Sequence, residues 1–300
     1  MKTNFIFFVC LIMFFACSKS KETKITKLRI VTTTGMLADG VKQLLGTTVE
    51  ITSLMGTGVD PHLYKATSKD LELLQEADII IYNGLHLEGK MSEIFEKLKR
   101  NKKVIAITDG LDKKELRMLG ENTYDPHIWF DVALWKKGWT YVAQELSKDS
   151  TLSATVKQNE NTFLQGLDSL DRWVKQEIAS IPLASRVLVT AHDAFGYFGR
   201  AYSMEVLGLQ GISTVSDFGL KDISNLVTLI SERKIKSVFI ETSVTPKAIE
   251  AVVEGCKNKG HNVQMGTALY SDAMGAEGTV EGTYIGMVKA NVTHIVQGLK

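Results

Sequence analysis

A long stretch without any predicted strand divides the sequence into two regions in which strands and helices alternate. Between Ala133 and about Ser180 only helical patterning occurs, with one interruption near residues 148–153. Alternation of short β-rich runs with amphipathic stretches, as found on both sides, is typical of α/β lobes with mostly parallel sheets. We therefore predict an α/β fold of two lobes, residues 28–132 and 182–300, joined by a single long helix within a helical connector at residues 133–181.

The second part of the connector, Ala154 to Ser180, has the spacing of one long, buried helix face. Its apolar residues recur at intervals of three, four and seven positions, as one side of an α-helix requires. A helix of about 26 residues is about 39 Å long, enough to run along both lobes and to oppose hinge motion between them. The apolar residues of this face are Val156, Phe163, Leu167, Leu170, Val174 and Ile178.

Each lobe is predicted from four β-rich runs and the helices between them. Thr67, followed by Asp70 three residues later, marks one helix start with the pattern of a capping box. In the first lobe the expected strands are Leu28–Thr34, Val49–Met55, Asp78–Asn83 and Lys103–Thr108, and the expected helices are 36–45, 68–76 and 90–100. In the second lobe the expected strands are Arg186–Ala191, Glu205–Leu209, Ser237–Glu241 and His261–Met265, and the expected helices are 222–233, 246–258 and 280–298.

The N-terminus has the pattern of an export signal. Lys2 precedes an uncharged apolar run from Phe5 to Ala16, which is short for a membrane-spanning helix but suits a signal peptide. The junction before Cys17 resembles the lipobox of bacterial lipoproteins, although Phe15 stands where a small residue is usual. We expect a lipoprotein signal and lipidation cysteine at residues 1–17 and a polar tether at 18–27; the alternative is an ordinary signal peptide with a chance cysteine.

Charge and cysteine content exclude other classes of protein. Lys and Arg total 35 and Asp and Glu total 34, so no net field attracts nucleic acid, and we expect no nucleic-acid partner. Cys10 and Cys17 lie in the signal region, which leaves Cys256 as the only other thiol and allows no internal disulfide in the mature chain. We expect Cys256, in a helical run, to be a packing residue.

Three of the six histidines follow predicted strands, where α/β proteins place functional groups. His62 lies in GTGVDPHLY (56–64), His127 in YDPHIWF (124–130), and His192 ends RVLVTAH (186–192). Asp272, in LYSDAMG (269–275), follows the last predicted strand and is a fourth candidate. Three imidazoles and one carboxylate suit Zn(II), and also Mn(II) if the carboxylate binds through both oxygens. A metal held by all four would bridge the lobes.

Each of these histidines could instead be a turn residue whose hydrogen bonds are satisfied locally. The DPH motif is short, but it occurs twice, each time in a loop punctuated by glycine or proline. The remaining histidines show no comparable setting. We expect His86 and His261 on the surface or in loops and His294 in a helix.

Five segments resemble the metal-binding extracellular solute-binding proteins of bacterial zinc and manganese ABC importers, the TroA-like family. They are DPHLYKATSKDL (60–71), DPHIWFD (125–131), TAHDAFGYFGRAY (190–202), VFIETSVTPKAIE (238–250) and LYSDAMGAEGTVEGTYIGMVKANV (269–292). The resemblance implies two α/β lobes joined by one long helix, and one Mn²⁺ or Zn²⁺ as transported ligand, bound by His62, His127, His192 and Asp272. It also implies an ABC permease with a separate ATPase subunit as partners, and a monomer at the periplasm or cell surface, anchored by Cys17.

The identity of the metal stays open between manganese and zinc. His192 stands where one manganese branch of the family has glutamate, and Val132 stands where proline is common. Residues 110–124 lack the histidine-rich loop of the zinc branch, and GTVEGTYIGM (278–287) resembles the manganese branch. The resemblance therefore leans towards manganese, whereas the donor set would bind Zn(II) more tightly at equilibrium.

Metal-bound imidazoles usually donate their second N–H to a carboxylate or carbonyl. Asp60, Asp125, Asp193 and Glu241 are candidates for such partners, or else turn formers, helix caps and solvated charges. An alternative function is a secreted zinc-dependent hydrolase, which would need an open metal position, and four protein ligands leave none. A third is an adhesin or structural lipoprotein that uses the metal only to hold its lobes together. The sequence contains no H-E-x-x-H, no G-x-x-x-x-G-K-[ST] and no G-x-G-x-x-G, which favours a binding protein that relies on a separate ATPase.

Overall fold

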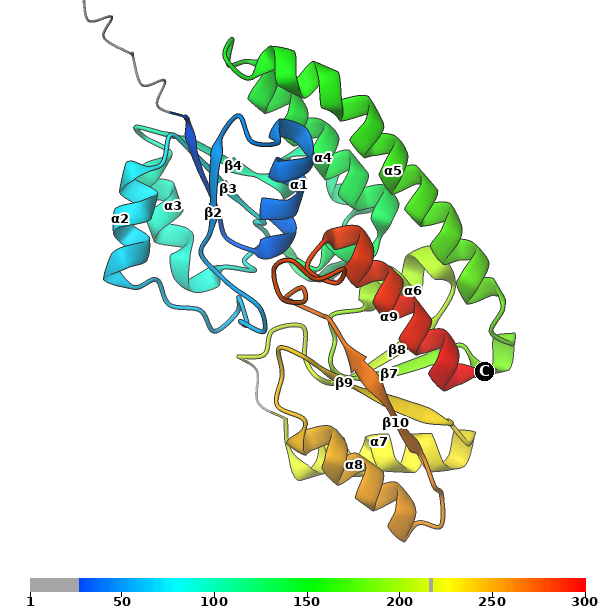
Figure 1. The fold of residues 1–300 in the computed structure, drawn as a ribbon. Helices are drawn as coiled ribbons and strands as arrows, with labels where there is room; N and C mark the ends of the chain where they lie inside the picture. Colours follow the sequence, from blue (N-terminus) through cyan, green and yellow to red (C-terminus); the bar gives the residue numbers. More distant parts are fainter. Residues whose placement is uncertain (1–26, 216–217) are drawn as a thin grey trace, which may run out of the picture.

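Two four-stranded parallel sheets form the framework of the computed structural model, which describes residues 27–215 and 218–300. The strand order is β2-β1-β3-β4 in the first sheet and β10-β9-β7-β8 in the second (Figure 1). The expected signal peptide and almost all of the tether lie outside the described residues. Among the helices of the described ranges, none is long and apolar enough to cross a membrane.

The first sheet is buried between two pairs of helices because the side chains of β3 alternate between its faces. Ile80 packs with Leu74 and Phe95, whereas Ile79 and Ile81 join the large core. Helices α2 and α3 lie on one side of this sheet, and α1 and α4 on the other (Figure 1). The predicted capping box of α2 is present, with Thr67 and Asp70 bonded in both directions. The elements are β1 (Arg29–Thr32), α1 (Gly35–Leu45), β2 (Glu50–Ser53), α2 (Ser68–Glu76), β3 (Ile79–Tyr82), α3 (Ser92–Leu98), β4 (Lys103–Ala106) and α4 (Val132–Ser147).

The second sheet repeats this arrangement. Val189 and Val238 face α7 and α8, whereas Leu188 and Phe239 face the large core that also contains α9. All six residues of β7 are buried, in keeping with its sequence VLVTAH, which has no alternation of apolar and polar residues. The elements are β7 (Val187–His192), α6 (Gly196–Tyr202), β8 (Glu205–Gln210), α7 (Leu220–Arg233), β9 (Ser237–Glu241), α8 (Lys247–Asn258), β10 (Gln264–Leu269) and α9 (Tyr284–Leu299).

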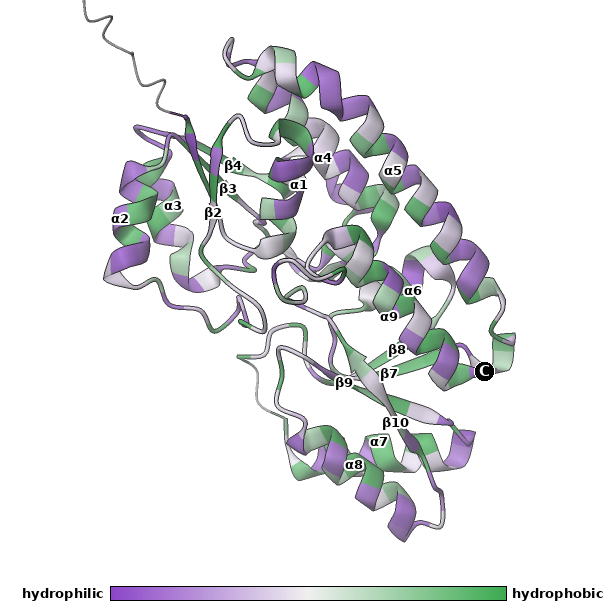
Figure 2. Cartoon of the chain, viewed as in Figure 1, coloured by the Kyte–Doolittle hydropathy of each residue, from purple (hydrophilic) through white to green (hydrophobic). Residues whose placement is uncertain are grey.

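The long helix α5 (Ser153–Ala179) runs along both sheets, beside α1 and α4 at one end and α6 and α9 at the other (Figure 1). Its hydrophilic residues recur along its length between hydrophobic ones (Figure 2). The buried residues of α5 are the six that the sequence predicts. They belong to one continuous apolar core that includes residues of both sheets. The predicted fold class, two parallel-sheet α/β lobes joined by a single long helix, is confirmed.

Three regions differ from the sequence expectations. The last strand begins at Gln264 rather than His261, because Gly260, at φ +77°, turns the chain after α8 and His261 bonds to the Ile235 carbonyl instead. A short antiparallel hairpin, β5 (Met118–Gly120) and β6 (Thr123–Tyr124), occupies a region expected to be irregular. Helix α6, which follows β7, was not predicted; its sequence contains two glycines.

Candidate metal centre

The four predicted candidates come from four different segments that meet between the two sheets. His62 lies in the loop after β2, and His127 directly precedes a 3-10 helix at Ile128–Phe130. His192 is the last residue of β7, and Asp272 follows the end of β10. All four residues are buried, with His62 5% exposed and the others 1% or less. The carboxyl ends of parallel strands thus converge on one site, as the sequence predicts.

One candidate donor atom from each residue lies within 4.8 Å of those of the other three. The Nε2 atoms of His62 and His127 are 3.2 Å apart, and Asp272 has oxygens 3.4 Å from the Nε2 atoms of both His127 and His192. The Nε2 atom of His62 is 3.8 Å from Asp272. Tetrahedral coordination at about 2.0–2.2 Å separates ligands by about 3.3–3.6 Å. The spacing therefore suits a single ion.

The chemistry of the cluster also fits a cation. Among the described residues, the Nε2 atom of His192 and both carboxylate oxygens of Asp272 are buried side-chain atoms without a hydrogen-bond partner. Unpartnered buried polar atoms are costly, and a carboxylate is more costly than a neutral group. A divalent cation would satisfy these atoms simultaneously.

Two of the imidazole rings are oriented by carboxylates on the side away from the cluster. The Nδ1 atom of His127 is 2.7 Å from Asp125, whose carboxylate also accepts the His127 backbone N–H at 2.9 Å. The Nδ1 atom of His192 is 2.5 Å from Glu241, which also accepts the His192 N–H at 2.8 Å. Parallel pairing places Thr190 opposite Phe239, so His192 and Glu241 lie side by side two residues later. With Nδ1 as donor, Nε2 is left free to bind a metal.

The other two predicted carboxylates play different parts. Asp60 accepts the backbone N–H of His62 at 2.8 Å and the hydroxyl of Thr214 at 2.5 Å, and so holds the loop rather than the ring. Within the described chain, Asp193 makes no hydrogen bond to any of the three imidazoles; its backbone N–H donates to the Gln210 carbonyl.

Burial and mutual charge interactions move the pKa values of the cluster in opposite directions. Burial lowers the pKa of His127, but the carboxylates of Asp125 and Asp272 outweigh it and raise that pKa to about 10. Burial lowers the pKa of His62 to about 4, against the attraction of Asp272. Burial would raise the pKa of Asp272, yet the neighbouring imidazoles hold it well below its usual range. The metal-free cluster therefore keeps an ionised Asp272 beside a protonated His127.

Replacing Glu241 by glutamine should weaken metal binding by about 10- to 100-fold, because loss of a carboxylate behind a metal-bound imidazole removes its orientation and basicity. The dissociation constant can be measured by competition with a coloured chelator. Glu250→Gln makes the same chemical change at an exposed position on α8 and should leave affinity unchanged. Equal affinities of the two variants would show that Glu241 does not support the site.

The other histidines and Cys256 lie outside the cluster, in the settings that the sequence predicts. His86 is exposed in a loop, His261 is half-buried in a loop, and His294 lies in α9 with its ring against the Ala268 carbonyl. Cys256 is buried in α8, as expected of a packing residue. The aromatic residues after His192 are also core residues: Phe195, Tyr197, Phe198 and Tyr202.

Two residues that support the site were not found by sequence reasoning. The indole N–H of Trp129 donates to the Ser271 carbonyl at 3.0 Å, which fixes the residue before Asp272 against the His127 turn. The guanidinium of Arg117 pairs with the buried carboxylate of Asp125. The only signal for Trp129 is its position two residues after His127, and nothing near Arg117 in the sequence marks it.

Comparisons with known proteins agree with this geometry. The family model of the zinc-uptake complex component A, periplasmic, matches residues 30–298. The manganese-binding lipoprotein MntA of Bacillus subtilis is 48% identical over 276 residues, covering 91% of this chain and 90% of that protein. The zinc-binding protein TroA of Treponema pallidum is 47% identical over 273 residues, covering 90% and 88% respectively.

Solved structures show the same fold. The periplasmic zinc-binding protein TroA from Treponema pallidum superimposes with a TM-score of 0.89 at 47% identity, covering 91% of this chain and 99% of that chain. Fe(III)-bound YtgA from Chlamydia trachomatis gives a TM-score of 0.82 at 26% identity, covering 91% and 98%. The resemblance inferred from the sequence is thereby confirmed. The chain belongs to the periplasmic zinc-uptake complex component A family, the metal-binding solute-binding proteins of ABC importers.

Proposed function

We propose that this protein binds one Mn²⁺ or Zn²⁺ through His62, His127, His192 and Asp272 and delivers it to an ABC permease driven by a separate ATPase. The observation that carries the proposal is the buried cluster in which three imidazoles surround a carboxylate with no hydrogen-bond partner. Relatives named for manganese and for zinc are almost equally similar, so either metal is consistent with the comparisons.

The donor set supports reversible binding rather than catalysis. Three neutral Nε2 atoms and one carboxylate fill a tetrahedral shell, and the second Asp272 oxygen can supply a fifth donor for Mn(II). A catalytic zinc site keeps a position open for water, which four protein ligands do not leave. The family consists of transport proteins, and nothing in the comparisons supports the hydrolase alternative.

The proposal also includes the domain boundaries and the attachment to the membrane. The lobes comprise residues 28–132 and 182–300, with the connector at 133–181, so that each lobe contributes two ligands. Export by the signal at residues 1–17, lipidation of Cys17 and the tether at 18–27 would keep a monomeric receptor at the membrane beside its permease. Relatives named as a manganese-binding lipoprotein and as a manganese ABC transporter substrate-binding lipoprotein support export and lipidation.

Deleting the gene should reduce uptake of radioactive manganese or zinc when these metals are limiting, and the wild-type gene should restore it. A gene encoding His62→Ala should fail to restore uptake although the protein is exported normally. His86→Ala, at an exposed loop histidine, should restore uptake fully. Unchanged uptake of both metals in the deletion strain would refute a transport role.

A further inference from the structure

His127 lies in an irregular segment whose position depends on bonds from other parts of the molecule. The segment runs from Glu115 through the hairpin β5–β6 and the 3-10 helix to Val132, where α4 begins. A ligand on irregular backbone keeps its geometry only if surrounding bonds hold it. The first sheet provides one such bond, from the Asn83 side chain to the Pro126 carbonyl at 3.0 Å.

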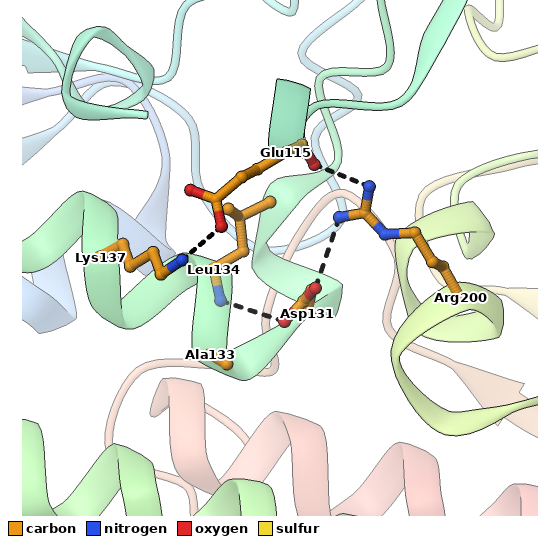
Figure 3. Close-up of a pocket in the computed structure, with 6 residues that line it drawn as sticks. All are labelled: Glu115, Asp131, Ala133, Leu134, Lys137 and Arg200. Carbon is orange, nitrogen blue, oxygen red and sulfur yellow. Dashed lines mark hydrogen bonds and ion pairs between the residues drawn. The ribbon is translucent and has the colours of Figure 1, made fainter. Parts of the chain in front are cut away.

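Helix α6, which belongs to the second sheet, binds this segment at both ends. The guanidinium of Arg200 donates to the Glu115 carbonyl at 2.6 Å and also lies 3.5 Å from the Asp131 carboxylate (Figure 3). The hydroxyl of Tyr202 accepts the backbone N–H of Val132 at 3.4 Å. These contacts join the two lobes on either side of His127.

Tyr197 binds the middle of the segment, next to the carboxylate that orients His127. Its buried hydroxyl accepts the backbone N–H of Arg117 at 3.0 Å and donates to the Asp125 carbonyl at 2.9 Å. The same Asp125 holds the Nδ1 atom of His127 through its side chain. Asp125 therefore links the Tyr197 hydroxyl, through its backbone carbonyl, to the imidazole of His127, through its carboxylate.

Helix α6 approaches the Arg117 side chain closely at Gly196, where a larger residue would displace the guanidinium. A Cβ atom on Gly196 would lie 1.2 Å from the guanidinium of Arg117, which pairs with Asp125. The ring of Phe195, the residue before it, stacks on Phe130 at a centroid distance of 4.2 Å. The contact between α6 and the His127 segment is thus closely packed as well as hydrogen-bonded.

Helix α6 begins four residues after His192, on the same continuous segment of chain. We propose that Tyr197 is a positioning residue that fixes His127 relative to His192, whose ring centroids lie 5.4 Å apart. Helix α6 then fixes the distance between two ligands, His127 and His192, that come from different lobes. The packing of α5 against both lobes contributes to the same effect. This inference rests on the proposed metal-binding function and assigns to α6 a role in setting the coordination geometry.

Cobalt(II) binding to purified Tyr197→Phe protein tests the proposal, because the visible absorption of Co(II) reports ligand geometry. Phenylalanine keeps the ring but removes both hydrogen bonds. We expect shifted Co(II) bands and metal dissociation about tenfold faster than in the wild type. Ser237→Ala is the matched control: it also removes a buried hydroxyl-to-carbonyl bond, at 2.6 Å to Gly298, but at the far end of β9. Its spectrum and dissociation rate should equal those of the wild type.

A Tyr197→Phe protein with wild-type Co(II) bands and dissociation rate would overturn the proposal, even if its thermal stability fell as in Ser237→Ala. If Tyr197→Phe does not fold, Arg200→Met removes a different bond between α6 and the His127 segment, at a partly exposed side chain. That variant should dissociate two- to threefold faster, with shifted bands, and wild-type behaviour would again overturn the proposal. Failure of the wild type to bind one Co(II) would instead refute the proposed function.

Discussion

Replacing Asp272 by asparagine should weaken Zn(II) or Mn(II) binding by roughly a hundred- to several-thousandfold. Asparagine has nearly the same shape, but it carries no charge and offers one oxygen, so the cation loses its only anionic partner in the cluster. Removing one member of a buried charge pair costs about 3–5 kcal/mol, and each 1.4 kcal/mol corresponds to about tenfold in affinity. The dissociation constant measured by chelator competition checks this expectation.

Asp193→Asn provides the control for charge removal near the site. Asp193 follows His192 directly but makes no hydrogen bond to the three imidazoles within the described chain. The metal affinity of Asp193→Asn should fall far less than that of Asp272→Asn, because Asp193 acts on His127 and His192 only through space and not through a hydrogen bond. Similar losses in both variants would mean that general electrostatics, and not coordination by Asp272, binds the metal.

Metal affinity should rise about tenfold per pH unit between pH 6 and pH 8. The pKa of His127 in the metal-free protein is raised to about 10, so this ring holds a proton throughout that range. Metal binding needs the neutral imidazole and must displace the proton, so higher pH favours the complex. The pKa of His192 is also raised, through Asp272 and Glu241 acting against burial, which would steepen the dependence. The pKa of His62, lowered to about 4, adds nothing above pH 6.

Calorimetry in two buffers with different ionisation enthalpies measures the protons released directly. At pH 8 we expect the release of at least about one proton for each ion bound. A histidine with the ordinary pKa of about 6.5 is almost fully neutral at this pH and would release almost none. Ser237→Ala, which changes a buried side chain at the far end of β9, should release the same number of protons. No proton release at pH 8, with a dissociation constant independent of pH, would contradict the electrostatic description of the metal-free cluster.

Regular patterns in the sequence predicted most of the fold. The buried face of α5 follows from its spacing, and β7 follows from an apolar run that is buried on both faces. The hairpin β5–β6 escaped prediction because strands of three and two residues are too short to show alternation. The predicted start of β10 was three residues too early because the strand's own sequence, QMGTAL, has only one buried residue and contains a glycine, so its apolar pattern is weak.

The sequence identified the four ligands and, in Asp125 and Glu241, two of their carboxylate partners, but not Trp129 or Arg117. Histidines at the ends of strands could be read from loop placement, whereas Asp272 needed the family resemblance to stand out from other acidic residues. The bonds that orient them join residues far apart in sequence, such as Trp129 with Ser271 and His192 with Glu241. Such contacts depend on which strands become neighbours in a sheet, as for His192 and Glu241, or on how the two lobes pack, as for Trp129 and Ser271, and no local pattern encodes either.

Anomalous diffraction at the metal absorption edge, from crystals of the protein loaded with Zn(II) or Mn(II), tests the central claim most directly. We predict one strong peak between the lobes, about 2.0–2.3 Å from the Nε2 atoms of His62, His127 and His192 and from at least one oxygen of Asp272. A peak elsewhere, or an ion at this position that lacks any one of these four ligands, would contradict the account.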